Sequence, residues 1–161
     1  MRTTIKLPAR KLVWTLLVGF AIVLIPNFVM AADNICTLQV SPVTFPAYNP
    51  LVTSDTQTHG TVTFNCTQSN LITVQLGTGG SGSFSARYMS GPSQLSYNLF
   101  LDAAGQIIWG DGTGGSQFYS NSSPPSNVNV ALQVYARIPA RQTQATPGIY
   151  RDTVVVTIIY Y

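Results

Sequence analysis

The stretch Gly60-Thr61-Val62-Thr63-Phe64-Asn65-Cys66 alternates polar and apolar side chains from Thr61 onward. Because successive side chains of a strand point to opposite faces of a sheet, the stretch predicts a β-strand with Val62, Phe64 and Cys66 directed toward a core. Similar short segments follow, separated by turns rich in glycine, serine, asparagine and proline. We expect strands at residues 36–45, 61–66, 71–76, 95–102, 107–109, 127–138 and 150–161.

The last stretch, Thr153-Val154-Val155-Val156-Thr157-Ile158-Ile159-Tyr160-Tyr161, differs because it is apolar on both faces. A strand of this kind must be covered on both faces, or it aggregates. It fits a central strand that is flanked by earlier strands. It also fits an edge beside a groove that receives a strand from another protein.

The composition after residue 32 favours an all-β chain. This part contains no lysine and no glutamate, the residues that usually fill helix surfaces, and it is rich in threonine, valine, tyrosine, serine and glycine. Six to eight short strands without a helix predict a β-sandwich of immunoglobulin-like type. Residues 110–125 are polar and rich in glycine, serine and asparagine, and we expect a long surface loop there.

The N-terminal segment is predicted to be a signal peptide, residues 1–32, followed by one domain, residues 33–161. Arg2, Lys6, Arg10 and Lys11 precede an apolar run at residues 12–25, and small residues follow up to Ala32. The alternative is a membrane anchor, but the apolar run is shorter than the roughly 20 residues that a spanning helix needs. We therefore expect an exported domain with no membrane span after cleavage.

Removal of the signal peptide changes the charge of the chain. The full sequence has a formal net charge of +3, but residues 33–161 contain four arginines and five aspartates, which leaves −1. No cluster of basic residues remains to bind phosphates, so the sequence argues against a nucleic-acid partner.

Both cysteines, Cys36 and Cys66, follow the predicted signal peptide. Two cysteines in an exported domain usually pair, and we expect a disulfide between them. The alternatives are a zinc site or free thiols. Two cysteines and one histidine cannot complete a zinc site without an aspartate, and an oxidising compartment disfavours free thiolates.

No catalytic, metal-binding or cofactor-binding residues are predicted. His59 stands beside Gly60, where we expect a turn at the surface. Asp111 lies between two glycines, as in an ordinary turn, and no second carboxylate lies at the spacing of a calcium loop. An enzyme or a carbohydrate-binding module is therefore the weakest hypothesis, and a structural or adhesive protein is favoured.

Several motifs, in this order, resemble the spore coat protein U domain family. The resemblance covers residues 36–161, and the matching segments are Cys36 with residues 43–50 (VTFPAYNP), residues 60–66 (GTVTFNC), 95–103 (LSYNLFLDA), 108–113 (IWGDGT), 134–142 (VYARIPARQ) and 147–158 (PGIYRDTVVVTI). The family includes subunits of archaic, Csu-type chaperone–usher pili, which act in surface attachment and biofilm formation.

The resemblance implies an immunoglobulin-like fold that lacks its last strand. A periplasmic chaperone would supply that strand first, and a neighbouring pilus subunit would replace it by donor-strand exchange. An outer-membrane usher would be a further partner. Val154, Val156, Ile158 and Tyr160 would then lie beside the groove that accepts the strand. The protein would be secreted, in the periplasm during transit and finally on the cell surface.

The N-terminus departs from the pattern of a pilus rod subunit, which carries a donor strand before its first cysteine. Only Asp33, Asn34 and Ile35 separate the predicted cleavage position from Cys36, and a pairing strand needs about 5–6 residues. We therefore expect a subunit at the pilus tip. The alternative is a secreted coat or surface protein of the same domain that does not polymerise.

Overall fold

The computed structural model describes residues 33–161, so the predicted signal peptide lies outside the described residues. Within them the fold is all-β, apart from one short 3-10 turn. The elements are β1 (Cys36–Ser41), β2 (Thr56–Cys66), β3 (Ile72–Leu76), η1 (Gly79–Ser81), β4 (Tyr88–Ser90), β5 (Gln94–Ser96), β6 (Asn98–Phe100), β7 (Tyr119–Asn121), β8 (Val130–Ile138) and β9 (Val156–Tyr160). No helix in this part of the chain has the length and hydropathy needed to cross a membrane.

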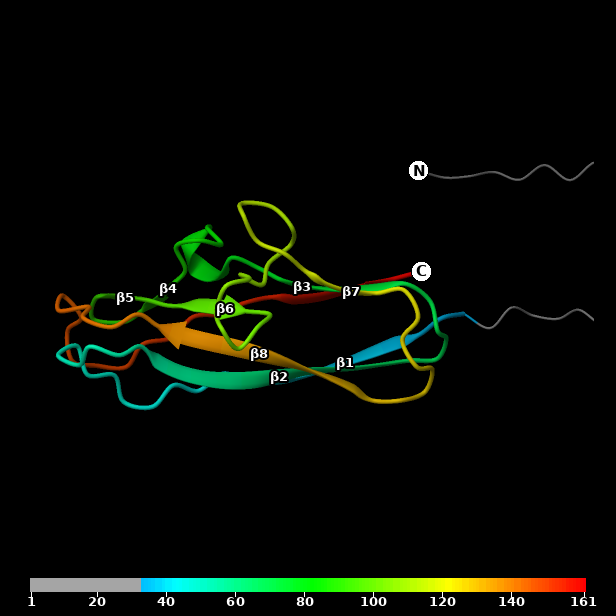
Figure 1. The fold of residues 1–161 in the computed structure, drawn as a ribbon, viewed down its shortest axis with the longest axis horizontal. Helices are drawn as coiled ribbons and strands as arrows, with labels where there is room; N and C mark the ends of the chain where they lie inside the picture. The colour runs from blue at the N-terminus through cyan, green and yellow to red at the C-terminus, as the bar shows by residue number, and fades with distance from the viewer. Residues whose placement is uncertain (1–32) are drawn as a thin grey trace, which may run out of the picture. The chain divides into compact units, whose positions relative to one another are not determined.

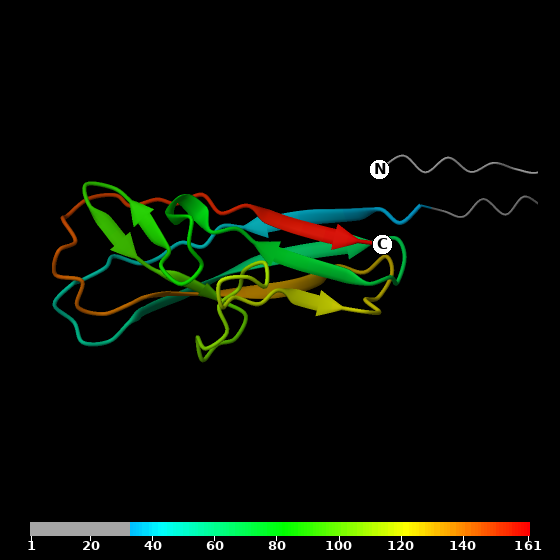
Figure 2. The ribbon, with the colours of Figure 1, turned by 90° about the horizontal axis from the view of Figure 1, so that it is seen from above.

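The strands form two layers, which confirms the predicted β-sandwich (Figure 1). The first layer is an antiparallel sheet in the order β1-β2-β8-β6. The second layer contains the antiparallel sheet β7-β3-β9 and the β4–β5 hairpin. In each main sheet one edge strand faces the same side of the sandwich: β1 in the first layer and β9 in the second (Figure 2).

The core consists of the inward rows that the alternation predicts. Val62, Phe64 and Cys66 on β2 are fully or almost fully buried, and so are the alternate apolar residues of β3. Trp109 is also fully buried, and its indole Nε1 donates a hydrogen bond to the carbonyl oxygen of Val74 at 3.0 Å. This side chain joins the turn after β6 to the second layer.

The strand predicted at residues 95–102 is two strands in different layers. β5 pairs with β4 in the hairpin, whereas β6 pairs with β8 in the first sheet, and the chain crosses between the layers at Tyr97. Leu95, Tyr97 and Leu99 are nevertheless all buried. The alternation was therefore right about which side chains enter the core, but alternation contains no information about the pairing partner.

Other differences concern short or polar segments. β4 was not predicted, and β7 lies inside the expected loop at residues 110–125. Residues 107–109 make only isolated bridges, and Val128, within the strand expected at residues 127–138, is 49% exposed before β8 begins. His59 lies on β2 opposite Tyr135 and not in a turn, although it is exposed as expected. Three-residue strands in glycine- and serine-rich sequence carry too little periodicity to be detected.

Arg87, just before β4, is fully buried between the layers. Its Nη1 donates to Asn98 Oδ1 at 2.8 Å, and its Nη2 donates to the carbonyl oxygens of Gly77 and Trp109 at 2.7 and 2.8 Å. The guanidinium carbon lies 5.3 Å from the centre of the Phe84 ring. Arg87 therefore satisfies carbonyl groups of two loops that would otherwise be buried without a donor.

The predicted disulfide is present. Cys36 and Cys66 are directly opposite each other in the β1–β2 ladder and are bonded. The bond fixes the start of β1, an edge strand, to the end of β2 in the interior of the sheet.

Replacing both cysteines with serine is expected to lower the free energy of unfolding by about 3 kcal/mol, because the unfolded chain regains the freedom of the loop that the bond closes. Urea unfolding followed by Trp109 fluorescence measures the difference. Equal unfolding midpoints for the wild type and the variant would contradict it.

Arg87→Met is expected to lower the free energy of unfolding by about 3–5 kcal/mol, because it leaves several buried acceptors without a donor. Arg141→Met is the matched control, since Arg141 is exposed, and its effect should stay within about 0.5 kcal/mol. The same urea experiment compares the two. An equal loss in both variants would show that the buried hydrogen bonds of Arg87 contribute little.

Candidate functional site

An open groove of about 990 Å³ runs along the side of the sandwich where β1 and β9 are the edge strands. We call residues 40–48 its first wall and residues 145–156 its second wall. Core side chains of both layers form the floor: Val62, Leu76, Met89, Leu95, Tyr97, Leu99, Val134 and Ile138. Among residues 33–161, the only charged residues that line the groove are Arg151 and Asp152.

The first wall begins as a paired strand and then leaves its sheet. β1 pairs with β2 up to Ser41, and Pro42, which has no amide hydrogen, follows. Within the described part of the chain, no backbone–backbone hydrogen bond involves residues 42–48. The one backbone contact is the hydroxyl of Thr58, which donates to the carbonyl oxygen of Thr44 at 3.0 Å. The remaining amide and carbonyl groups of this segment have no partner in a sheet.

Gly60 permits the path of the first wall. A Cβ atom at this position would lie 2.8 Å from Val43 Cγ2 and 2.9 Å from the carbonyl oxygen of Ser41. Any larger residue on β2 would therefore push the first wall away from the sheet. Gly60, the first residue of the stretch 60–66, thus allows Val43 and Phe45 to pack against the core.

The second wall is paired on one side only. Arg151 exchanges two backbone hydrogen bonds with Ser90, at 2.8 and 2.9 Å, and the carbonyl oxygen of Val155 accepts one from the amide of Gly77 at 2.8 Å. Backbone groups of a strand alternate between its two edges. The amide and carbonyl groups of Asp152, Val154 and Val156 therefore face the groove. The groove is thus bordered on both sides by backbone groups without sheet partners.

The four residues that the family resemblance implies beside a groove, Val154, Val156, Ile158 and Tyr160, occupy one row of the last strand. Val154 and Val156 line the groove and are half-buried. Ile158 and Tyr160 continue the row along β9, opposite Val74 and Ile72, beyond the residues that line the groove. The structure thus brings two of the four to the groove and leaves the other two further along the same strand.

The other row of the last strand is exposed, contrary to the expectation that both faces would be covered. Val155 is 66% exposed and Tyr161 is 71% exposed, and β9 is an edge strand and not a central one. The position at the edge was the second of the two alternatives left open by the sequence.

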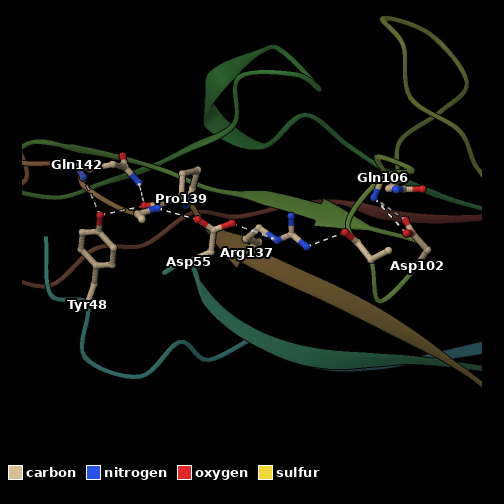
Figure 3. A network of polar contacts seen from close by, with 9 residues as sticks. Tyr48, Asp55, Asp102, Gln106, Arg137, Pro139 and Gln142 are labelled. Carbon is tan, nitrogen blue, oxygen red and sulfur yellow. Dashed lines mark hydrogen bonds and ion pairs between the residues drawn. The ribbon is translucent and has the colours of Figure 1, made fainter. Parts of the chain in front are cut away.

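Hydrogen bonds fix the far end of the first wall to the loop after β8 (Figure 3). The hydroxyl of Tyr48 donates to the carbonyl oxygen of Pro139 at 2.9 Å and accepts from the amide of Gln142 at 2.8 Å. The side-chain amide of Gln142 bonds both backbone groups of Ser96 on β5. Tyr48 therefore ties the first wall to both layers.

A surface network continues from this point along the first layer (Figure 3). Asp55 accepts a hydrogen bond from the amide of Ala140 at 2.9 Å and lies 3.6 Å from Arg137 Nε. Arg137 also donates to the carbonyl oxygen of Ala104 at 2.8 Å and lies over the Phe100 ring. The partly exposed ion pair contributes little by itself, about 0–1 kcal/mol, so the network serves to position loops.

One polar contact interrupts the apolar floor. The hydroxyl of Tyr97 donates to Asp152 Oδ2 at 2.6 Å, and Asp152 Oδ1 accepts from the amides of Gly80 and Thr153 at 2.9 and 2.8 Å. Burial raises the pKa of Tyr97 well above its usual value, and the hydrogen bond to Asp152 adds to this effect. Burial lowers the pKa of Arg87, while the charges of Tyr97 and Asp152 oppose that shift. The hydroxyl of Tyr97 is therefore a permanent donor to the second wall.

The arrangement suits binding of an extended segment. Such a segment could pair with the free backbone groups of the walls and place alternate side chains on the floor. Within residues 33–161 no group of three or more histidine, cysteine, aspartate or glutamate residues could hold a metal ion. Asp111 accepts hydrogen bonds from the amide and hydroxyl of Thr113, which lower its pKa, and this is the turn geometry that the sequence predicted.

The sequence did not predict that residues 42–48 border a groove, nor did it predict the polar contact between Tyr97 and Asp152. The strand expected at residues 36–45 pairs with its sheet only up to Ser41, and Val43 and Phe45 keep the alternation of a strand beyond that point. That alternation was the available signal. Nothing in the pattern connects Tyr97 with Asp152, because 55 residues separate them.

Comparisons with known proteins agree on one family. The model of the Spore Coat Protein U domain matches residues 24–157. "Protein U" of Myxococcus xanthus is 31% identical over 131 residues, which cover 72% of this chain and 70% of that protein.

A solved structure has a similar fold. It is the CsuC–CsuE chaperone–tip adhesion subunit pre-assembly complex from archaic chaperone–usher Csu pili of Acinetobacter baumannii, with a TM-score of 0.57 and 20% identity. The match covers 78% of this chain but only 40% of the solved chain, so the present chain corresponds to less than half of that molecule. At this identity the likeness concerns the fold. The match to the family model and the identity to Protein U show that the chain belongs to the spore coat protein U domain family.

Proposed function

We propose that this protein is a structural, non-enzymatic subunit of a chaperone–usher pilus and that its groove accepts a β-strand from a partner. The observation that carries the proposal is the pair of walls with unpaired backbone groups on either side of an apolar floor. An inserted strand would hydrogen-bond to the walls and cover Val40, which is 51% exposed although it belongs to the inward row of β1. The similarity to a pilus subunit complex supports the same function.

The partners follow from this function. A periplasmic chaperone supplies the first strand, an outer-membrane usher exports the subunit, and another pilus subunit supplies the final strand. The predicted signal peptide, residues 1–32, directs the chain to the periplasm, and the assembled pilus is on the cell surface. There it contributes to attachment and biofilm formation. Val154, Val156, Ile158 and Tyr160 contact the inserted strand. A position at the tip is part of the proposal, and the short segment between the predicted cleavage position and Cys36 supports it.

A second candidate is a coat or surface protein that does not polymerise. The observation that favours it is the 31% identity to Protein U, which exceeds the identity to the solved pilus complex. In that case the groove would be closed within the same molecule or remain empty, and no second chain would be needed for solubility.

Co-expression of the full chain with a chaperone encoded beside it separates the two candidates. For a pilus subunit, we expect soluble protein only as a one-to-one complex with the chaperone, because the apolar floor and free edges promote aggregation when exposed. Size-exclusion chromatography of periplasmic extracts measures this. A soluble, cooperatively folded monomer obtained without the chaperone would exclude the pilus function. N-terminal sequencing of the same product tests the tip position, which a long extension before Cys36 would rule out.

The direction of side chains on the second wall gives a sharper test. Val154→Lys places a charge in the groove and should weaken strand binding at least tenfold, because a buried, unpaired charge costs several kcal/mol. Val155→Lys, one residue away, changes an exposed side chain of the outer row and is the matched control. Co-purification with the chaperone gives the readout. Equal loss in both variants would argue against insertion between the walls.

A further inference from the structure

Among the described floor residues, only Tyr97 makes both an aromatic contact with the first wall and a side-chain hydrogen bond to the second wall. Its ring makes an edge contact with the Phe45 ring of the first wall, with ring centres 6.2 Å apart and planes at 76°. Its hydroxyl donates to Asp152 of the second wall at 2.6 Å. The side chain itself is almost completely buried, so its position is fixed by the core.

Asp152 is in turn fixed to the second layer. Its Oδ1 accepts from the amide of Gly80 in η1, and a Cβ atom at Gly79 would lie 2.1 Å from its Oδ2. Gly79 also has a φ of +67°, a conformation that favours glycine. The turn around η1 is therefore shaped to admit this carboxylate. The positive charge of Arg87 interacts favourably with Asp152, although the two side chains form no direct ion pair within residues 33–161.

The second wall needs such a support because it has no neighbour on its groove side. Between the backbone pairs at Arg151 and Val155, the side chain of Asp152 provides its main attachment. The floor beside it is apolar, and burial of Val154 and Val156 against that floor would be favourable. Without a fixed support, the wall could settle into the groove and close it.

We propose that the Tyr97–Asp152 hydrogen bond holds the empty groove open, so that Tyr97 is a positioning residue for strand uptake. This inference rests on the proposed function. A groove that is already open binds its strand without first paying for reorganisation, and the gain appears in the association rate. Once a strand is inserted, its own hydrogen bonds hold both walls in place. The Tyr97–Asp152 hydrogen bond then contributes less to the position of the second wall.

Tyr97→Phe removes only the hydroxyl and keeps the ring contact with Phe45. The chain is attached to a sensor surface as its complex with the chaperone, and the chaperone is then washed off, so that neighbouring empty chains cannot aggregate. The probe is a fluorescent synthetic peptide of about 12 residues, long enough to span the second wall, in which valine alternates with serine and lysine. We expect the variant to take up this peptide about tenfold more slowly than the wild type, as for loss of one hydrogen bond to a charged group. Tyr135→Phe is the control, because the hydroxyl of Tyr135 makes no hydrogen bond within residues 33–161, and it should leave the rate unchanged.

A second measurement separates positioning from general stability. The same peptide sequence is joined to Tyr161 through an Asn-Gly turn, so that it returns antiparallel to β9 and fills the groove. In this form we expect Tyr97→Phe and Tyr135→Phe to have similar unfolding midpoints. A double-mutant cycle with Asp152→Ala should show that the two changes slow uptake less together than the product of their separate effects.

The outcomes distinguish the inference from the function on which it rests. A wild-type chain that takes up no peptide overturns the proposed function and this inference with it. Equal uptake rates for the wild type and Tyr97→Phe overturn the inference alone. The inference is also overturned if Tyr97→Phe lowers the unfolding midpoint of the chain that carries the joined peptide, relative to Tyr135→Phe, by as much free energy as it adds to the barrier for uptake. That result would indicate a structural role only.

Discussion

The main constraint on this fold is a set of backbone groups along the groove that make no hydrogen bond to a neighbouring strand within residues 33–161. Residues 42–48 and the groove-facing groups of residues 152–156 present two backbone edges without sheet partners. Buried backbone groups are almost always paired in folded proteins, and free strand edges invite pairing with another chain. The sandwich therefore has free backbone groups on both sides of an open groove, and the strand that we propose to enter it would place apolar side chains on the floor.

The elements around the groove compensate for these free groups by other attachments. The disulfide fixes the start of β1 to β2, and Tyr48 fixes the end of the first wall to the loop after β8. On the opposite side, the backbone pair between Arg151 and Ser90 fixes the second wall to β4. Each of these attachments lies at an end of a wall or on its outer side, and the hydrogen bond from Tyr97 to Asp152 adds one from the floor. The groove can thus stay unfilled while its borders stay in place.

The sequence predicted the layers and the buried rows better than it predicted the pairing. Alternation on β2 and β3 identified side chains that are almost fully buried, because burial depends on the local period of two. It did not reveal that the chain changes layers at Tyr97, because both strands continue the same alternation. Of the candidate site, Val154 and Val156, which the family resemblance placed beside a groove, line the groove of the structure. The first wall and Asp152 were missed, because their roles depend on contacts between distant parts of the chain.

The last strand shows why one pattern supported two interpretations. Its inner row faces the core and the groove, as the row of a central strand would, whereas Val155 on its outer row is 66% exposed. A strand in the interior of an antiparallel sheet that faces solvent on one side would carry polar residues in that row. Exposed apolar residues in the outer row of an edge strand lower solubility, and folding of this chain does not require them. Contact with another molecule would account for such a strand. The strand that we propose to enter the groove would cover the edge and the inner row of β9, but not the outer row.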